Sequence, residues 1–464
     1  MLAKYAEQLA ALAEDASQLG LTSQAAMARR WLPPIPPNTL RYAQRPPIAA
    51  DAAAPSVAGK ASSPKQTEDS QPSVETQWRE RFDQARSAQA KALFALAGEA
   101  VEAGEASLAF PLLVEALRED PDHAAARKIL GYERMKDRWV TPYEARKTRE
   151  KQVWHPQFGW LPAANVKRYE VGEQFYRGRW MKTEDANRLG AQPKNGWDVA
   201  TEHYVVHTNH SLEEGVRLAT RLERLYDVWQ QAFSAFCATD EQLARRYHGQ
   251  AATRREPPQH KVVLFRDRDQ YIEALKEEQP NIDLSSGFYL ASRREAYFYF
   301  AEGERDDTTL YHEATHQLFS EIRPVSRDIG RTANFWIVEG IACYMESLVE
   351  QDGWTLLGGN DAVRLRDAQH RLLADDFYVP LAELTGFGME TLQRDPRIAR
   401  LYSQSAGLTH FLIHAAGGRY RRPLIEYLVA VYTGRDRPST LADVTGESDV
   451  RLDEQYREFL KSIK

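Results

Sequence analysis

The chain contains 464 residues, of which 43% are hydrophobic and 10% aromatic, so it is long enough for two or three domains with at least one sizeable core. Its net charge of −6 gives no global sign of nucleic-acid or anionic-membrane binding, and we expect no nucleic-acid partner. Cys237 and Cys343 are the only cysteines, which excludes a disulfide framework but leaves a single bridge and a reducing compartment both open.

The N-terminal segment is amphipathic and lacks the uninterrupted apolar region of a signal peptide. No stretch approaches the roughly 18 apolar residues that a transmembrane helix needs. We therefore expect a soluble, cytoplasmic protein without a membrane span, although a misassigned start codon could hide an export signal.

Residues 1–32 are predicted to form a pair of short helices. One apolar stripe with helical spacing supports this, and it consists of Leu2, Tyr5, Leu9, Leu12 and Ala16. Nine of the 23 prolines then lie between Pro33 and Pro72, among alanine, serine, glutamine and threonine. Such a composition cannot bury enough apolar surface to order itself, so residues 33–76 are predicted to be a flexible linker.

Helical patterning returns over residues 77–136, with small residues where helices would cross. The pattern is typical of one or two tetratricopeptide-type helical hairpins, and a generic helical hairpin explains it about as well. These N-terminal helices offer a surface for a protein partner.

A short internal repeat occupies residues 137–195, with Trp139, Trp160 and Trp180 spaced by 21 and 20 residues. The repeat predicts small structural units, each of which packs one tryptophan against the next helix. A peptide-binding aromatic groove is the alternative.

Residues 196–464 form the last predicted domain. Alternating and continuous apolar segments at 197–208, 260–265 and 294–302 are typical of strands, whereas almost everything after residue 307 is predicted to be helical. A small sheet followed by a mostly helical half, preceded by an all-α N-terminal region, indicates the α+β class.

One motif in this domain is typical of zinc enzymes. His312 and His316 are four residues apart on a predicted helix, so both imidazoles face the same side and can reach one tetrahedral metal ion. Glu313 can act as a general base on water that the metal acidifies. Two surface histidines beside a solvated glutamate are the alternative, because short motifs also occur by chance.

A second predicted helix supplies the third ligand that such a site needs. Glu339 lies within an otherwise apolar helical pattern, and a buried carboxylate requires a partner or a metal. Glu346, two turns later on the same face, can accept a hydrogen bond from the far nitrogen of a ligating histidine.

Together these residues resemble the gluzincins, metallopeptidases whose third zinc ligand is a glutamate on a following helix. The resemblance covers roughly residues 197–435, and the motifs that carry it are His312-Glu313-Ala314-Thr315-His316, Trp336, Glu339-Gly340, Tyr344 and Glu346. The second helix is most similar to the aminopeptidase N-like branch. The layout resembles a branch of the peptidase-MA-like superfamily in which a helical or tetratricopeptide-like part precedes the catalytic domain.

The resemblance implies a thermolysin-like fold, a Zn²⁺ cofactor and a peptide or protein substrate. It makes His312, His316 and Glu339 the zinc ligands and Glu313 the general base. The later helix around Tyr402 is similar to the gluzincin helix whose tyrosine stabilises the attacked carbonyl.

The same resemblance assigns a strand to substrate binding. Residues Ala296, Tyr297, Phe298, Tyr299 and Phe300 stand where gluzincins have an edge strand that pairs with extended substrate. Plain core packing explains these aromatics equally well.

Two departures from the family pattern limit the comparison. The Gly-x-Met-Glu-Asn segment by which aminopeptidase N-like enzymes hold a free amine is missing, so aminopeptidase specificity is not supported. Cys343 stands where thermolysin-type enzymes carry an acid. Glu346 is therefore the residue expected to accept the hydrogen bond from the far nitrogen of a ligating histidine.

Two functions follow from these observations. The first is a zinc metallopeptidase that cleaves peptide bonds with metal-activated water and Glu313 as general base. The second is a peptide-binding or scaffold protein whose metallopeptidase domain no longer catalyses. The presence of Glu313 favours the first, because a purely structural zinc site has no use for that carboxylate.

Overall fold

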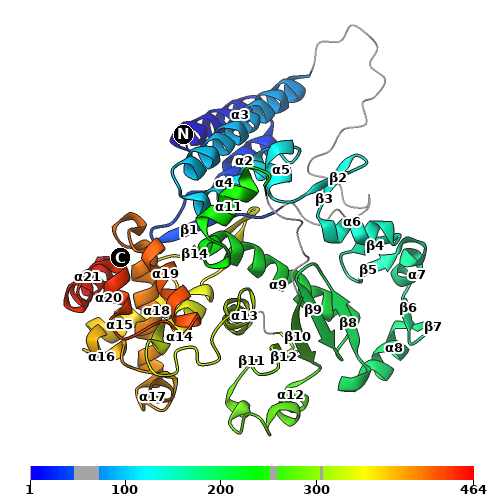
Figure 1. Cartoon of the computed structure of the whole chain (residues 1–464). Helices are drawn as coiled ribbons and strands as arrows, with labels where there is room; N and C mark the ends of the chain where they lie inside the picture. Colours follow the sequence, from blue (N-terminus) through cyan, green and yellow to red (C-terminus); the bar gives the residue numbers. More distant parts are fainter. Residues whose placement is uncertain (1, 46–72, 251–258, 304–306) are drawn as a thin grey trace.

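The computed structural model describes residues 2–45, 73–250, 259–303 and 307–464 (Figure 1). It confirms the α+β class, with small sheets and a helical C-terminal half. No helix in the described part of the chain is long and apolar enough to cross a membrane.

The described residues of the N-terminal region contain five helices. They are α1 (Leu2–Gln18), α2 (Thr22–Trp31), α3 (Val74–Glu102), α4 (Ala106–Glu119) and α5 (Ala124–Ile129). The apolar stripe of α1 packs against Trp78 and Phe82 of α3, so the chain itself covers most of it. Helices α3 and α4 form one helical hairpin, whose likeness to a tetratricopeptide unit stays a prediction.

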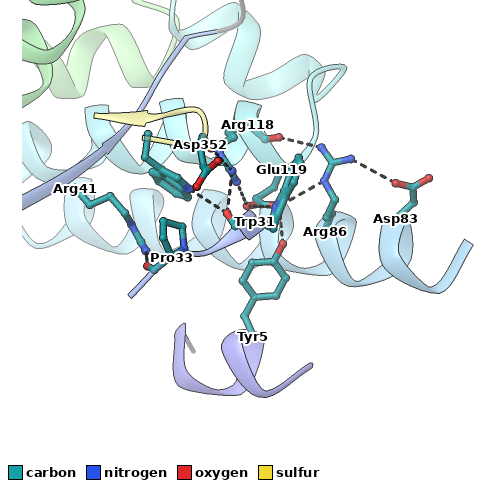
Figure 2. Close-up of polar contacts among 10 residues, drawn as sticks. Tyr5, Trp31, Pro33, Arg41, Asp83, Arg86, Arg118, Glu119 and Asp352 are labelled. Carbon is teal, nitrogen blue, oxygen red and sulfur yellow. Dashed lines mark hydrogen bonds and ion pairs between the residues drawn. The ribbon is translucent and has the colours of Figure 1, made fainter. Parts of the chain in front are cut away.

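A buried carboxylate holds these helices together (Figure 2). Glu119 at the end of α4 is only 3% exposed. It accepts hydrogen bonds from the Tyr5 hydroxyl at 2.7 Å, the Trp31 indole at 2.9 Å and Arg118 at 3.2 Å. The Arg118 guanidinium also lies 4.2 Å from the ring centre of Trp354, far along the chain. One ion-paired cluster therefore links α1, α2 and α4 to the C-terminal domain.

The prediction of a flexible linker over residues 33–76 is wrong for part of this range. Residues Thr39–Ala43 form strand β1, which pairs antiparallel with β14 (Trp354–Gly358), itself paired with β13 (Val349–Gln351). Proline-rich composition does not prevent order here, because β14 supplies a partner for the backbone groups of β1. Residues 46–72 of the predicted linker lie outside the described residues.

The tryptophan repeat folds into three units of a hairpin followed by a short helix. The units are β2–β3–α6 (Glu133–Met135, Arg138–Val140, Pro142–Arg149), β4–β5–α7 (Gln152–His155, Gly159–Pro162, Val166–Glu170) and β6–β7–α8 (Glu173–Tyr176, Arg179–Lys182, Thr183–Gly190). Each tryptophan lies on the second strand of its hairpin. Trp160 and Trp180 contact the rings of Tyr143 and Tyr169, which belong to the helix of the preceding unit.

A five-stranded sheet forms the centre of the C-terminal domain. Its order is β11 (Gly287–Leu290), β12 (Glu295–Tyr299), β10 (His260–Phe265), β9 (Tyr204–Thr208) and β8 (Trp197–Ala200). β10 runs parallel to both neighbours, whereas β11 and β8 are antiparallel to theirs. Helix α9 (Leu212–Ala232) follows β9 and packs on the sheet.

β12 is therefore not an edge strand, and the prediction that Ala296–Phe300 pairs with substrate is wrong. β12 is hydrogen-bonded to β11 on one side and to β10 on the other, so its backbone has no free side. Its aromatics serve packing, since Phe298 joins the main core and Tyr297 stacks on Phe265.

The remaining helices form the C-terminal half, with the two short strands β13 and β14 among them. The site-bearing helices are α13 (Thr308–Glu321), α14 (Phe335–Met345), α15 (Val363–Leu373) and α18 (Ile398–His414). The others are α10 (Ser234–Cys237), α11 (Asp240–Tyr247), α12 (Arg268–Leu275), α16 (Leu381–Leu384), α17 (Met389–Gln393), α19 (Arg421–Tyr432), α20 (Thr440–Thr445) and α21 (Asp449–Ser462).

Helices α14 and α18 approach closely because Gly340 has no side chain. A Cβ at this position would lie 2.5 Å from the Thr409 hydroxyl and 2.7 Å from the Ser405 carbonyl oxygen. Since the second of these atoms belongs to the backbone, a larger residue would force the two helices apart.

We expect Gly340→Ala to lower the melting temperature, because overpacking of this kind typically costs about 1–3 kcal/mol. Gly98→Ala in α3 is the control, since its Cβ would meet only the end of the Tyr247 side chain. Alanine is favoured over glycine in a helix by about 0.5–1 kcal/mol, so the control should be neutral or stabilising. Equal melting temperatures for both variants would contradict tight α14–α18 packing.

Candidate metal centre

Helix α13 places two imidazoles side by side. Leu310, Ala314 and Leu318 are buried in the main core, which directs the His312 and His316 face toward α14. The two Nε2 atoms lie 3.2 Å apart, as one helical turn allows.

Helix α14 brings the third donor to the same point. Glu339 is 6% exposed, and its Oε2 lies 3.4 Å from His312 Nε2 and 3.6 Å from His316 Nε2. Asn334 precedes this helix in a left-handed conformation that asparagine tolerates, with φ of 57°. Its amide is bound to Asp436 at 2.8 Å and to the Tyr427 hydroxyl at 2.6 Å, which fixes where α14 begins.

The electrostatics of the three residues are coupled. Burial alone would raise the pKa of the Glu339 carboxyl, but His316 and His312 hold it far below its usual value. Burial lowers the pKa of His312, yet its hydrogen bonds to Cys343, Glu339 and Glu346 raise the pKa well above the ordinary range. The Glu339 carboxylate is thus stabilised in its charged form between His312 and His316.

This donor set suits a metal ion. One atom from each of His312, His316 and Glu339 lies within 4.8 Å of the others, so the three can converge on one ion. Two imidazoles and a carboxylate, with a fourth position open, form a common ligand set of catalytic zinc sites.

An outer layer of hydrogen bonds orients His312. Its Nδ1 lies 2.8 Å from Glu346 Oε1, and an N–H donated there leaves the Nε2 lone pair facing Glu339. Arg364 of α15 binds both oxygens of Glu346, at 2.8 and 3.1 Å.

A second group of donors surrounds the other ring nitrogen of His312. His312, Cys343 and Glu346 also lie within 4.8 Å of one another. Arg364 already neutralises Glu346, and a cation at this point would meet the guanidinium charge. The Glu339 group is therefore the better metal site.

Glu313 lies beside the ligands and is held by the sheet. Its Oε2 accepts a hydrogen bond from the backbone N–H of Tyr289 in β11, at 2.9 Å. Burial raises the pKa of its carboxyl, although His312, His316 and the Tyr289 N–H act in the opposite direction. A raised pKa suits a group that must take and release a proton near neutral pH.

Tyr402 approaches the same centre from α18. Burial raises the pKa of its hydroxyl far above the usual value, and the charge of Glu339 and a hydrogen bond to it add to the rise. The structure thus brings together His312, Glu313, His316, Glu339, Glu346 and Tyr402, and leaves Ala296, Tyr297, Phe298, Tyr299 and Phe300 in and beside a central strand.

The pairs His410/His414 and His207/His210 form no metal-binding group within the described residues. His410 and His414 are buried in α18, where burial lowers the pKa of both, and His414 Nε2 lies 3.0 Å from the Tyr344 hydroxyl. His207 binds Asp198 at 2.7 Å on the sheet.

The comparisons with known proteins cover the same segment. A family described as "Protein of unknown function (DUF1570)" matches residues 306–430, which include the helices that carry the metal-site residues. No curated protein matches the chain.

Sequence reasoning missed two residues of the centre, Arg364 and Tyr289. Arg364 has no motif around it, because only the packing of α15 on α18 brings it to Glu346. Tyr289 contributes a backbone N–H, which no side-chain pattern can reveal.

We expect Arg364→Met to weaken metal binding by roughly 10–100-fold, the usual loss when an outer hydrogen-bonding partner of a ligand is removed. Without the guanidinium, Glu346 is free to turn away from His312 Nδ1. Competition with a chromophoric chelator measures the affinity. Arg366→Met is the matched control on the same helix, since Arg366 binds Gln369 and the Lys464 carbonyl instead. Equal losses in both variants would contradict an orienting role for Arg364.

Proposed function

We propose that the chain is a zinc-dependent hydrolase of peptide bonds with a gluzincin-type, thermolysin-like catalytic domain. The observation that carries this proposal is the convergence of His312 Nε2, His316 Nε2 and Glu339 Oε2 within 3.2–3.6 Å, next to a glutamate held for proton transfer. A purely structural site would not need Glu313 beside the ligands.

Bound zinc would supply a Lewis acid that acidifies water and polarises the scissile carbonyl. Glu313 takes the proton of the attacking water, while the Tyr289 N–H keeps its carboxylate in place. Glu313 then passes this proton to the leaving amine. The Tyr402 hydroxyl donates a hydrogen bond to the oxygen that becomes negative as the carbonyl is attacked.

Edge strand β11 is the better candidate for substrate pairing. Its one neighbour in the described sheet is β12, so its opposite side is unpaired by strands. Because a residue in an antiparallel strand directs its N–H and C=O to the same side, the Tyr289 carbonyl points the way its N–H does, toward Glu313. An extended peptide laid along β11 would then pass directly over the metal-binding group.

The alternative, a peptide-binding protein with a non-catalytic domain, predicts the same metal content but no hydrolysis. Metal analysis alone does not separate the two. Cleavage of an unbiased peptide library, abolished by a chelator and restored by zinc, supports the hydrolase.

We expect Glu313→Gln to keep about one equivalent of zinc and to lose about 10²–10⁴-fold in hydrolysis rate, the usual contribution of a general base. Glu339→Ala should instead lose zinc occupancy, because it removes a ligand. Elemental analysis and peptide cleavage of both variants measure the two effects separately. Full activity in Glu313→Gln would place the base elsewhere, and full zinc in Glu339→Ala would refute the ligand assignment.

Tyr402→Phe should lower kcat by roughly 10²–10³ and change KM little, because the lost hydrogen bond is made mainly in the transition state. The substitution removes only the hydroxyl, so packing in α18 persists. Steady-state kinetics and melting temperature are measured together. A constant kcat with a lower melting temperature would make Tyr402 a packing residue.

A further inference from the structure

A separate cavity of about 750 Å³ lies between α9 of the C-terminal domain and the first hairpin unit. Its walls come from the end of β1, from α5, β3 and the start of α6, and from the loop before β9. None of its described lining residues belongs to the metal centre. The volume falls in the range of small-molecule sites, about 300–1,000 Å³.

Several charges in this cavity are already compensated. Asp227 is ion-paired with Arg45, and Glu223 lies 2.7 Å from His203. These ion pairs need no ligand. The charged lining residues that form no ion pair therefore indicate which ligand the cavity would bind.

Arg127 is the cation that is left over. It lines the cavity and is 6% exposed, yet no carboxylate of the described chain lies within ion-pair distance of it. Its Nε donates to the Pro121 carbonyl at 2.8 Å, and the guanidinium lies 4.4 Å from the ring centre of Tyr132. Burial lowers the pKa of the Arg127 guanidinium, although the charges of Glu144 and Asp122 act in the opposite direction. An anionic ligand in direct contact would stabilise the charged form further.

Glu144 and Glu202 are two lining carboxylates that form no ion pair within the described residues. Burial raises the pKa of Glu144 to about 7 and the charge of Glu202 adds to the rise, whereas the Thr141 N–H, Arg138 and Arg127 act in the opposite direction. Glu144 accepts one hydrogen bond, from the Thr141 N–H at 2.7 Å, and Glu202 has no polar partner in the described part of the chain. A cation between the two carboxylates would relieve their repulsion.

Indole rings complete the wall. Trp139 and Trp154 line the cavity, and the buried Nε1 of Trp139 has no hydrogen-bond partner within the described residues. We infer that this cavity is a second binding site, for a small zwitterion of the amino-acid or short-peptide class. Its carboxylate binds Arg127, its ammonium group lies between Glu144 and Glu202, and an apolar side chain packs on the indoles.

This site does not depend on the proposed peptidase activity, so its test measures ligand binding in protein that cannot hydrolyse peptides. Full-length Glu313→Gln protein, freed of metal by chelation, is titrated calorimetrically with the dipeptide Ala-Phe and with L-phenylalanine. N-acetyl-Ala-Phe lacks the ammonium group and Ala-Phe amide lacks the carboxylate. We expect one equivalent of Ala-Phe or phenylalanine to bind and each blocked dipeptide to bind about tenfold more weakly or worse.

Substitutions in the cavity then locate the binding. Arg127→Gln, Glu144→Gln and Glu202→Gln should each weaken binding by about tenfold. Glutamine preserves the capping box in which Glu144 takes part, so the helix α6 should persist. Glu7→Gln and Arg79→Gln on exposed helix faces remove the same charges elsewhere and should have no effect.

The inference is overturned if neither zwitterion binds at millimolar concentration, if the blocked dipeptides bind as tightly, or if the cavity variants match the two controls. Should Arg127→Gln fail to fold, Glu202→Gln still decides, because the Glu202 side chain has no polar partner to lose in the described structure.

Discussion

The burial of one carboxylate organises the C-terminal domain. Glu339 lies on a helix whose other residues are almost all apolar, and a charge in such a place must be compensated. α13 meets this requirement with two imidazoles, and α18 meets it with the Tyr402 hydroxyl. The three helices therefore converge on the point where a metal ion would bind, and the glycine after Glu339 permits the close approach of α14 and α18.

Much of this centre was predictable because its chemistry is local in sequence. The spacing of His312 and His316 fixes their relative position on any helix, and Glu339 stood out as the acid in an apolar helical pattern. Those features predicted the two helices that carry these residues, α13 and α14. Their shared position in space is what the structure adds.

The features that sequence reasoning missed depend on contacts between distant segments. β1 is stable only because β14 lies beside it, some 300 residues later, and proline content alone suggested a linker. The hairpin β13–β14 did carry a signal, the Asp352-Gly353 pair between two strand-like segments. The resemblance to gluzincins placed β12 at a sheet edge, but β11 pairs with β12 on that side, and sheet order cannot be read from the sequence alone.

The attachment of residues 2–45 has a consequence for the integrity of the chain. β1 and the Glu119 cluster hold this segment by strand pairing and ion-paired hydrogen bonds. None of these contacts involves the stretch of chain that connects Arg45 to Ser73. Cutting the chain within that interval would leave two fragments that stay associated as one particle. The protein is in this respect a natural candidate for splitting into complementary halves, with the smaller half covering the edge of β14 that would otherwise be open to aggregation.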